Sequence, residues 1–429
     1  MDNGMVVIGV ENPALHYLVC DVRAHAGPRF ERSEESGLTH FLEHMLTQGS
    51  GKFPDSNILM RAVEDLGGML DATTHPEWVE LSLGVHSKHW RRGLEILSDM
   101  LLDPLFDERE IEDEKRIVAQ ELAEYRDQHQ RNISAAELAY TLLLRDEPDE
   151  LGTRGSLATL QSFDRDMVRA HYERYVVPQN MVVALAGAFE FEDVFQALAS
   201  SLGTMQGGDG RPQIIPPQAG SRRARSVYRI TERHPMVDVE LCHPAYGLGD
   251  ERYETFRAAG HILGGGLSSR LFTHVREELG LVYHIASFSD AYSDTGAVLT
   301  SLSVDCANLP AAVQATLDVT EAFMREGATE QELERHKETV RCGVEIMCDR
   351  PHSLAAWFGQ QELLLRPERL RTPEEQIARV EDITPDALHQ VMGEVFDRAG
   401  AGMAVVGPFG EQEKERLRET FPAREHPGE

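Results

Sequence analysis

The chain has 429 residues, which is too long for one ordinary domain and predicts two domains of about 200 residues each. It has 42 lysines and arginines against 72 aspartates and glutamates, and the net charge of −30 disfavours nucleic acid and anionic membrane as partners. It shows no secretory signal, no membrane-spanning apolar run and no paired pattern among its five cysteines, so we expect a cytoplasmic protein with reduced thiols.

The first candidate site lies on a predicted helix that follows two predicted strands, at 5–10 and 15–24. This helix contains the pattern His-x-x-Glu-His, formed by His40, Glu43 and His44. Side chains three and four residues apart share a helix face, so His40 and His44 can bind one metal ion while Glu43 reaches a metal-bound water. A catalytic zinc usually has three protein ligands, so one more ligand must come from elsewhere in the chain.

Residues 69–85 predict two strands with a bend at Pro76. Proline cannot donate a backbone hydrogen bond to a sheet, so the first of the two strands is predicted to lie at an edge. An extended peptide can add a strand to such an edge. The candidate substrate-aligning residues on it are Asp71, Ala72, Thr73 and Thr74.

The third ligand is sought on the next long helix, which begins near Asp107 with Glu110 three residues later, as in a capping box. Glu114 and Glu121 are seven residues apart and share one side of this helix. Glu121 is the candidate ligand, and Glu124, about one turn further on, is the alternative. A glutamate on so acidic a helix is usually a solvated carboxylate, so this assignment depends on the His-x-x-Glu-His pattern.

A change in composition divides the chain. Between residues 205 and 225, glycine, proline, glutamine and arginine predominate, which predicts a linker. We therefore expect an N-terminal metal-binding domain at 1–204 and a homologous C-terminal domain at 226–429.

The C-terminal half repeats the pattern of the first half. Asp107, Glu110 and Lys115 have counterparts 222 residues later in Thr329, Glu332 and Lys337. The same shift places Ile262, Gly265, Gly266 and Gly343 at the positions of His40, Glu43, His44 and Glu121. Only His261 lies nearby, without a complete ligand set around it. The second domain is therefore predicted to keep the fold and to lack the metal site.

These motifs resemble the pitrilysin-like (M16) zinc metallopeptidases, in the short two-domain branch that includes the subunits of the mitochondrial processing peptidase. The resemblance rests on His40-Phe41-Leu42-Glu43-His44 with Glu121 at the family's spacing, and it covers nearly the whole chain. It implies an α+β fold with two homologous domains, each a mostly antiparallel sheet covered by helices. It also implies one Zn²⁺ per chain, with Glu114 supporting the ligands, and two chains that close like a clamshell around a chamber.

The resemblance further implies that Arg276 and Tyr283 contact substrate near the zinc of an opposing domain. One chain that carries both sets of residues favours a homodimer with each site completed in trans, and a heteromeric partner of the same family stays open. The chain departs from the family at the edge strand, where Asp71-Ala72 replaces the frequent Asn-Ala.

The resulting hypothesis is a zinc-dependent endopeptidase that hydrolyses peptides or unfolded segments inside a closed chamber. Glu43 would transfer the proton of the attacking water, and Arg276 and Tyr283 would stabilise the oxyanion or hold the substrate backbone. Two alternatives remain: a non-catalytic scaffold or partner subunit of the same fold, and a metal-dependent module that binds peptides without cutting them. The complete ligand set and Glu43 favour the peptidase.

Overall fold

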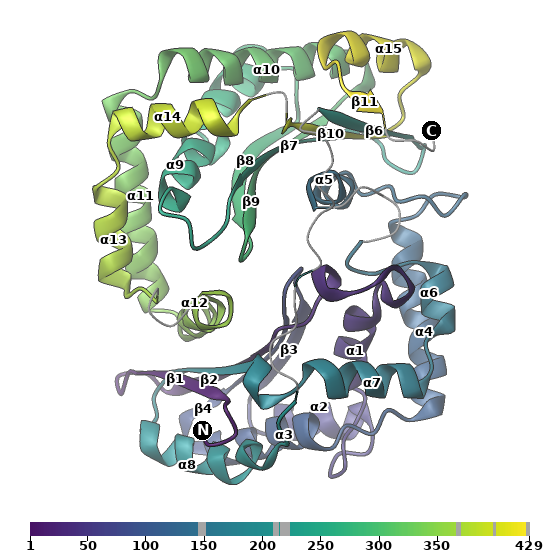
Figure 1. Ribbon diagram of the computed structural model, residues 1–429, viewed down its shortest axis with the longest axis vertical. Coiled ribbons are helices and arrows are strands. Elements are labelled where there is room, and N and C mark those ends of the chain that lie inside the picture. Colours follow the sequence, from purple (N-terminus) through teal and green to yellow (C-terminus); the bar gives the residue numbers. More distant parts are fainter. Residues whose placement is uncertain (145–151, 209–213, 215–223, 366–369, 398–399, 426–429) are drawn as a thin grey trace. The chain divides into compact units, whose positions relative to one another are not determined.

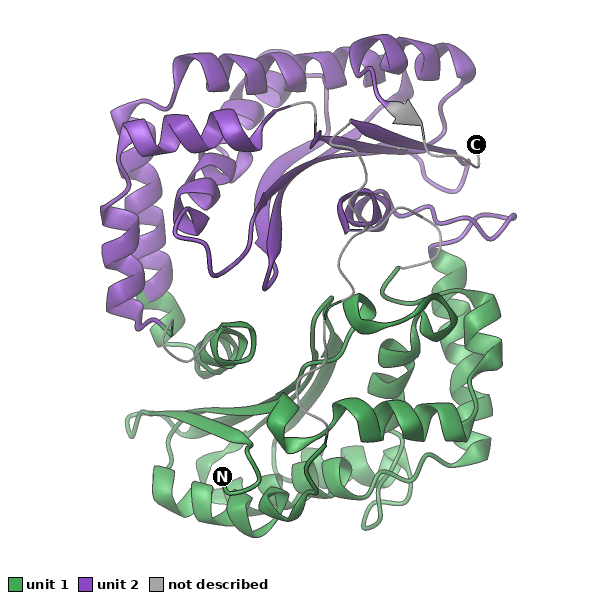
Figure 2. Ribbon diagram, in the orientation of Figure 1, with its two compact units in different colours: residues 1–124, 150–216, 345–370 green, residues 125–149, 217–344, 371–429 purple. Residues whose placement is uncertain are grey.

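The computed structural model of the chain describes residues 1–144, 152–208, 214, 224–365, 370–397 and 400–425 (Figure 1). Contacts divide the chain into two compact units, each assembled from several segments (Figure 2). Unit 1 comprises residues 1–124, 150–216 and 345–370, and unit 2 comprises residues 125–149, 217–344 and 371–429. Most of the linker predicted at 205–225 lies outside the described residues.

Unit 1 is built on a mixed sheet. Within the described residues its strands pair in the order β1-β5-β2-β4-β3, with β1 parallel to β5 and the other neighbours antiparallel. The strands are Val6–Glu11 (β1), Tyr17–Ala24 (β2), Met69–Thr74 (β3), Val79–His86 (β4) and Met181–Gly187 (β5). β3 lies at an edge of this sheet, as the bend at Pro76 indicated.

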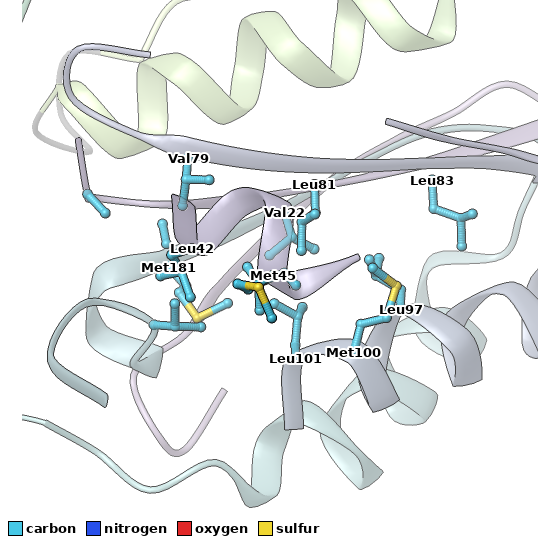
Figure 3. Close-up of a cluster of buried hydrophobic side chains, with 14 of the residues drawn as sticks. Val22, Leu42, Met45, Val79, Leu81, Leu83, Leu97, Met100, Leu101 and Met181 are labelled. Carbon is cyan, nitrogen blue, oxygen red and sulfur yellow. The ribbon is translucent and has the colours of Figure 1, made fainter. Parts of the chain in front are cut away.

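Helices cover both faces of the unit 1 sheet. One face packs on a large apolar cluster in which Figure 3 labels Val22, Leu42, Met45, Leu81 and Leu97. The helices of this unit that precede the linker are Leu38–Leu46 (α1), Ser56–Glu64 (α2), Trp90–Leu102 (α3), Glu108–Glu124 (α4), Leu157–Ser162 (α6), Arg165–Tyr175 (α7) and Phe191–Ser200 (α8). The opposite face, which includes Val19 and Ala184, is covered by Pro351–Leu364 (α12) from far along the chain.

Unit 2 repeats this sheet order. Within the described residues β6-β10-β7-β9-β8 follow the order and the pairing directions of unit 1, and a short β11 is added next to β6. The strands are Arg225–Ile230 (β6), Val237–Tyr246 (β7), His284–Ala291 (β8), Thr295–Val304 (β9), Gly402–Gly407 (β10) and Arg424–Glu425 (β11). The shared order shows that both units follow one plan.

The helices of unit 2 include one that precedes the linker, α5, whose Leu138 and Leu142 pack against the sheet residues Val227 and Ala404. The helices are Ala135–Leu144 (α5), Tyr253–Gly264 (α9), Leu309–Glu326 (α10), Glu330–Cys348 (α11, which continues into unit 1), Pro373–Glu381 (α13), Pro385–Val395 (α14) and Glu411–Thr420 (α15). The α+β class with two domains is confirmed, because each unit is a mixed sheet with its own helices.

Two segments depart from the expected boundaries. Residues 125–149 group with the C-terminal unit, and residues 345–370 group with the N-terminal unit. The physical reason is the burial of apolar side chains, since α5 and α12 each cover a sheet face that belongs to the other half of the sequence. In the part of the chain that is described, no helix combines the length and apolarity that crossing a bilayer requires.

Candidate metal centre

Three predicted side chains converge in unit 1. The Nε2 atoms of His40 and His44 are 3.3 Å apart, and Oε2 of Glu121 lies 3.7 Å from the first and 3.8 Å from the second. Donor atoms at zinc's usual bond length of about 2.0–2.1 Å in a tetrahedron are about 3.4 Å apart. The three side chains therefore fit one zinc-sized ion. Among the described residues, these three side chains also form a cluster in which one ligand atom from each lies within 4.8 Å of the other two.

Glu114 orients His44 from behind. Its Oε1 lies 2.7 Å from Nδ1 of His44, and its Oε2 accepts a hydrogen bond of 2.7 Å from Gln48. This arrangement places a proton on Nδ1 and leaves the lone pair of Nε2 toward His40 and Glu121, as metal-binding histidines require. Burial opposes the charged imidazole, but the hydrogen bond and charge of Glu114 outweigh it and raise the pKa of His44.

His40 lies deeper, with 8% of its surface exposed. Burial and the neighbouring His44 lower the pKa of His40 to about 4, so its imidazole is neutral at physiological pH. The neutral imidazole is the form that binds a metal ion. His40 thus meets the chemical requirement of a ligand as well as the geometric one.

Arg154 holds Glu121 in place and was missed by the sequence analysis. Its Nε donates a hydrogen bond of 2.6 Å to Oε1 of Glu121, which leaves Oε2 facing the two histidines. Burial opposes ionisation of Glu121, but Arg154 and His40 hold the pKa of that carboxyl below its usual value. The alternative ligand Glu124 is exposed and does not belong to the cluster.

Glu43 lies beside the ligands and is tied to the edge strand. Its Oε2 accepts a hydrogen bond of 2.5 Å from Oγ1 of Thr74, the last residue of β3. Burial raises the pKa of Glu43, and the charges of Glu121 and Asp71 act in the same direction. A carboxylate with a raised pKa next to a metal site can accept a proton from water.

The start of α1 is fixed by a buried carboxylate rather than by the serines at 33–36. Those residues form a short 3-10 turn, and α1 begins at Leu38 after Gly37, whose φ is 86°. Glu31 is fully buried, and its two oxygens accept hydrogen bonds from the backbone N–H groups of Gly37 at 2.8 Å and Thr39 at 2.7 Å. Glu31 therefore replaces a helix cap and positions the helix that carries both histidines.

The predicted substrate strand presents two kinds of side chain. β3 pairs with β4 on one side, where Asp71 lies opposite Ser82, and within the described residues no strand pairs with its outer side. Asp71 and Thr73 are exposed, whereas Ala72 packs against the apolar cluster and Thr74 contacts Glu43. The strand thus links an open edge directly to the candidate metal centre.

Arg276 and Tyr283 lie together in unit 2. The Nε of Arg276 donates a hydrogen bond of 3.0 Å to the backbone carbonyl of Tyr283, and the side chain of Tyr283 is exposed. Arg276 belongs to the π-helical segment Phe272–Glu278, and Tyr283 immediately precedes β8. Both line a cavity of about 500 Å³ with the glycines at 264–266 and the first residues of β8.

Two family profiles match the chain. Residues 6–145, which include all three converging side chains, match the profile described as Insulinase (Peptidase family M16). Residues 162–340 match the profile described as Peptidase M16 inactive domain. A Bacillus subtilis (strain 168) protein named Uncharacterized zinc protease YmxG is 27% identical over 415 residues, which span 95% of this chain and 97% of the relative.

Two solved structures extend the likeness to the fold. The crystal structure of a protease from Helicobacter pylori has a TM-score of 0.85 at 18% identity and covers 95% of this chain and 98% of its own. A chain of Complex III2 from Candida albicans has a TM-score of 0.79 at 16% identity, with coverage of 97% and 98%. At these identities the structures show that the fold is shared across almost the full length of the chain.

Proposed function

The chain belongs to the M16 peptidase family, and on that premise we propose that it is a zinc-dependent endopeptidase acting on peptides or unfolded segments. The observation that carries this proposal is the convergence of His40, His44 and Glu121 with Glu43 beside them. Relatives of similar length are named zinc proteases, which supports the same assignment.

In this proposal His40, His44 and Glu121 hold one zinc ion per chain. When bound, zinc supplies Lewis-acid chemistry, because it polarises the scissile carbonyl and makes water more acidic. Glu114 keeps the Nε2 lone pair of His44 directed at the ion, and Arg154 keeps one oxygen of Glu121 directed there.

Glu43 moves the proton. Its Oε2 is held by Thr74, so the carboxylate has a fixed position from which Oε1 can accept a proton from the attacking water. The same carboxyl then delivers that proton to the nitrogen of the leaving amine. The exposed edge of β3 aligns the substrate backbone, which would bring a peptide bond close to Glu43 because Thr74 connects the two.

We further propose that the enzyme works as a homodimer, in which Arg276 and Tyr283 of one chain contact the substrate bound by the other. The support is chemical: a guanidinium and an exposed phenol on one cavity wall suit a peptide carbonyl or a developing oxyanion. A heteromeric partner of the same family would satisfy the same chemistry.

The decisive experiment compares Glu43→Gln with the parent protein. We expect zinc content to stay the same while cleavage of a mixed peptide library falls by about 100-fold or more, because the proton acceptor is lost. Glu124→Gln is the matched control, since it removes the same charge from an exposed position of α4 and should leave cleavage unchanged. Mass spectrometry of the library identifies the bonds that are cut.

Other outcomes would favour the alternatives. Full cleavage by Glu43→Gln would contradict the assigned mechanism. A zinc-loaded parent protein that retains peptides without cutting them would indicate a binding module, and one that neither binds nor cuts would indicate a scaffold subunit. Loss of zinc in Glu43→Gln would instead give that glutamate a structural role.

A further inference from the structure

Unit 2 contains a second pair of facing histidines, separate from the candidate metal centre. The ring centroids of His261 on α9 and His336 on α11 are 5.0 Å apart with planes inclined by 55°. The corresponding values for His40 and His44 are 4.6 Å and 69°. The two pairs therefore have similar geometry although they occupy different units.

The repeat explains where this second pair lies. His336 is 222 residues after Glu114, which is the same offset that relates other positions of α4 and α11. Glu114 contacts His44 in unit 1, so His336 occupies the place of the residue that supports the metal centre. Unit 2 is thus predicted to lack the ligand set of unit 1, but it has a different pair of imidazoles at the equivalent position.

The pair encloses unsatisfied polar atoms. His261, His336 and Ser269 line a cavity of about 30 Å³. His336 is 4% exposed and Ser269 is 7% exposed, and within the described residues neither Nδ1 of His336 nor Oγ of Ser269 has a hydrogen-bond partner. Buried polar atoms without partners are costly, so an occupant of the cavity is expected to satisfy them.

Both imidazoles have the protonation state of metal ligands. Burial lowers the pKa of His336 to about 3, and the neighbouring His261 and Arg257 act in the same direction. Burial also lowers the pKa of His261, again with a contribution from Arg257. Neither imidazole has to release a proton near pH 7 before it can bind a metal ion.

We propose that His261 and His336 bind a divalent transition-metal ion, with Ser269 and water completing its coordination. Imidazole donors suit Zn²⁺, Ni²⁺ and Cu²⁺ rather than Mg²⁺ or Ca²⁺, which prefer oxygen. A cavity of about 30 Å³ accommodates one ion with a water molecule.

The surrounding charges set the strength of this site. Arg270 is paired with Glu332 at 2.7 Å and Lys337 with Glu334 at 3.4 Å, while Arg335 lines the same cavity. The proposed site has two imidazoles and no carboxylate ligand, and Arg335 lines its cavity, so the ion is held more weakly than at His40, His44 and Glu121. The site in unit 2 is therefore the second to fill.

The test is the zinc content of the full-length protein after chelator treatment and equilibrium dialysis against increasing Zn²⁺. The parent protein should bind two equivalents, the tighter one first. His336→Ala should bind one equivalent and keep its peptidase activity, His44→Ala should bind one weaker equivalent, and the double variant should bind none. Counting bound zinc makes the result independent of whether the chain cuts peptides.

Two further variants keep the test decisive. His261→Ala changes a half-buried residue and should remove the same equivalent, which covers the case that His336→Ala does not fold. His86→Ala controls for adventitious binding, because the exposed ring of His86 lies 6.2 Å from that of His16 and 6.4 Å from that of His89. A single equivalent in the parent protein, or a second equivalent that is lost only in His86→Ala, would overturn the proposal.

Discussion

At the scale of single residues, the candidate metal centre depends on the groups that hold its ligands as much as on the ligands. Glu114 and Arg154 both act this way, one on His44 and the other on Glu121. Glu114 is seven residues before Glu121 on the same helix, so helical periodicity reveals it. Arg154 comes from a loop 33 residues after its partner, and no local pattern connects the two.

Arg154 therefore offers a test of orientation. In Arg154→Met, Glu121 loses the hydrogen bond that fixes one oxygen, and the carboxylate can turn away from the histidines. We expect the affinity for zinc to fall by about 10- to 100-fold, measured by competition with a chromogenic chelator. Excess zinc should restore cleavage. Arg109→Met removes the same charge from an exposed position of α4, and an equal loss of affinity there would refute the orienting role.

Glu240 shows how a single buried carboxyl can influence stability. It is 4% exposed, Oε2 accepts a hydrogen bond of 2.6 Å from Ser301, and Oε1 has no partner within the described residues. Burial raises the pKa of Glu240 from 4.5 to about 7, with Asp238 acting in the same direction. The folded protein therefore binds this proton more tightly than the unfolded chain, so stability from Glu240 is present below pH 4.5 and is lost as pH rises to 7.

Glu240→Gln removes this dependence because an amide does not ionise. Relative to the parent protein, the variant should gain stability between pH 4.5 and 7, by on the order of 3 kcal/mol at neutral pH and above. Thermal unfolding followed across this pH range measures the difference as a rise of several degrees in melting temperature. The exposed Glu251→Gln should show no such trend. A pH-independent difference for Glu240→Gln would contradict the assignment.

At the scale of elements, the sequence predicts what is local and misses what is distant. The spacing of His40 and His44 defines one face of α1, and the apolar positions Phe41, Leu42 and Met45 define the buried face. The strand at 5–10 was also predicted, yet its partner could not be, because β1 pairs with β5 across about 175 residues of chain. Periodicity indicates which side chains are buried, but the partner strand follows from the packing of the whole unit.

The start of α1 illustrates the same limit. Serines and acidic residues stand at 33–36, just before α1, but the acceptor for the first backbone N–H groups is Glu31, which lies before that stretch. Gly37 adopts a positive φ, and a Cβ there would approach the backbone oxygen of Arg154 to 2.5 Å. The loop that supplies Arg154 thus also packs closely against the glycine that precedes α1.

Replacing Glu31 tests whether its hydrogen bonds fix the start of α1. Glu31→Ala leaves the N–H groups of Gly37 and Thr39 buried without their acceptors, which should reduce the free energy of unfolding by about 1–3 kcal/mol for each group. Zinc affinity should fall with it, because α1 carries both histidines. Glu31→Gln keeps one acceptor oxygen, so it should lose less stability and less zinc affinity than Glu31→Ala. Calorimetry measures the stability, and chelator competition measures the zinc affinity. Equal effects of the two substitutions would show that charge, rather than the hydrogen bonds, matters.

At the scale of the whole molecule, the two units keep one plan while their functional residues differ. The strand order of unit 1 recurs in unit 2, but the positions of His40, His44 and Glu121 hold other residues there. Burial in the sheets preserves the order of strands, because a strand that moved would expose its apolar side chains. Side chains at the ends of elements carry no such constraint, so each unit could acquire its own chemistry.

The proposed completion of each site by residues of a second chain predicts how mixed dimers behave. Glu43→Gln removes the proton acceptor, and Arg276→Ala removes the proposed substrate contact, so each variant alone should cleave poorly. If sites are completed in trans, a mixed dimer has one site with both defects and one with neither. Random pairing makes about half of the dimers mixed, so the mixture should recover about a quarter of the parent activity.

Co-expression of the two variants with different affinity tags allows the mixed dimer to be purified and assayed against each parent variant. If the mixed dimer cleaves well above the mean activity of the two single variants, one chain must supply Glu43 and the other must supply Arg276. Sites completed within one chain would give no recovery, because every chain in the mixture is defective. Sedimentation of the parent protein as a monomer would exclude the arrangement by itself, since a contact in trans needs a second chain.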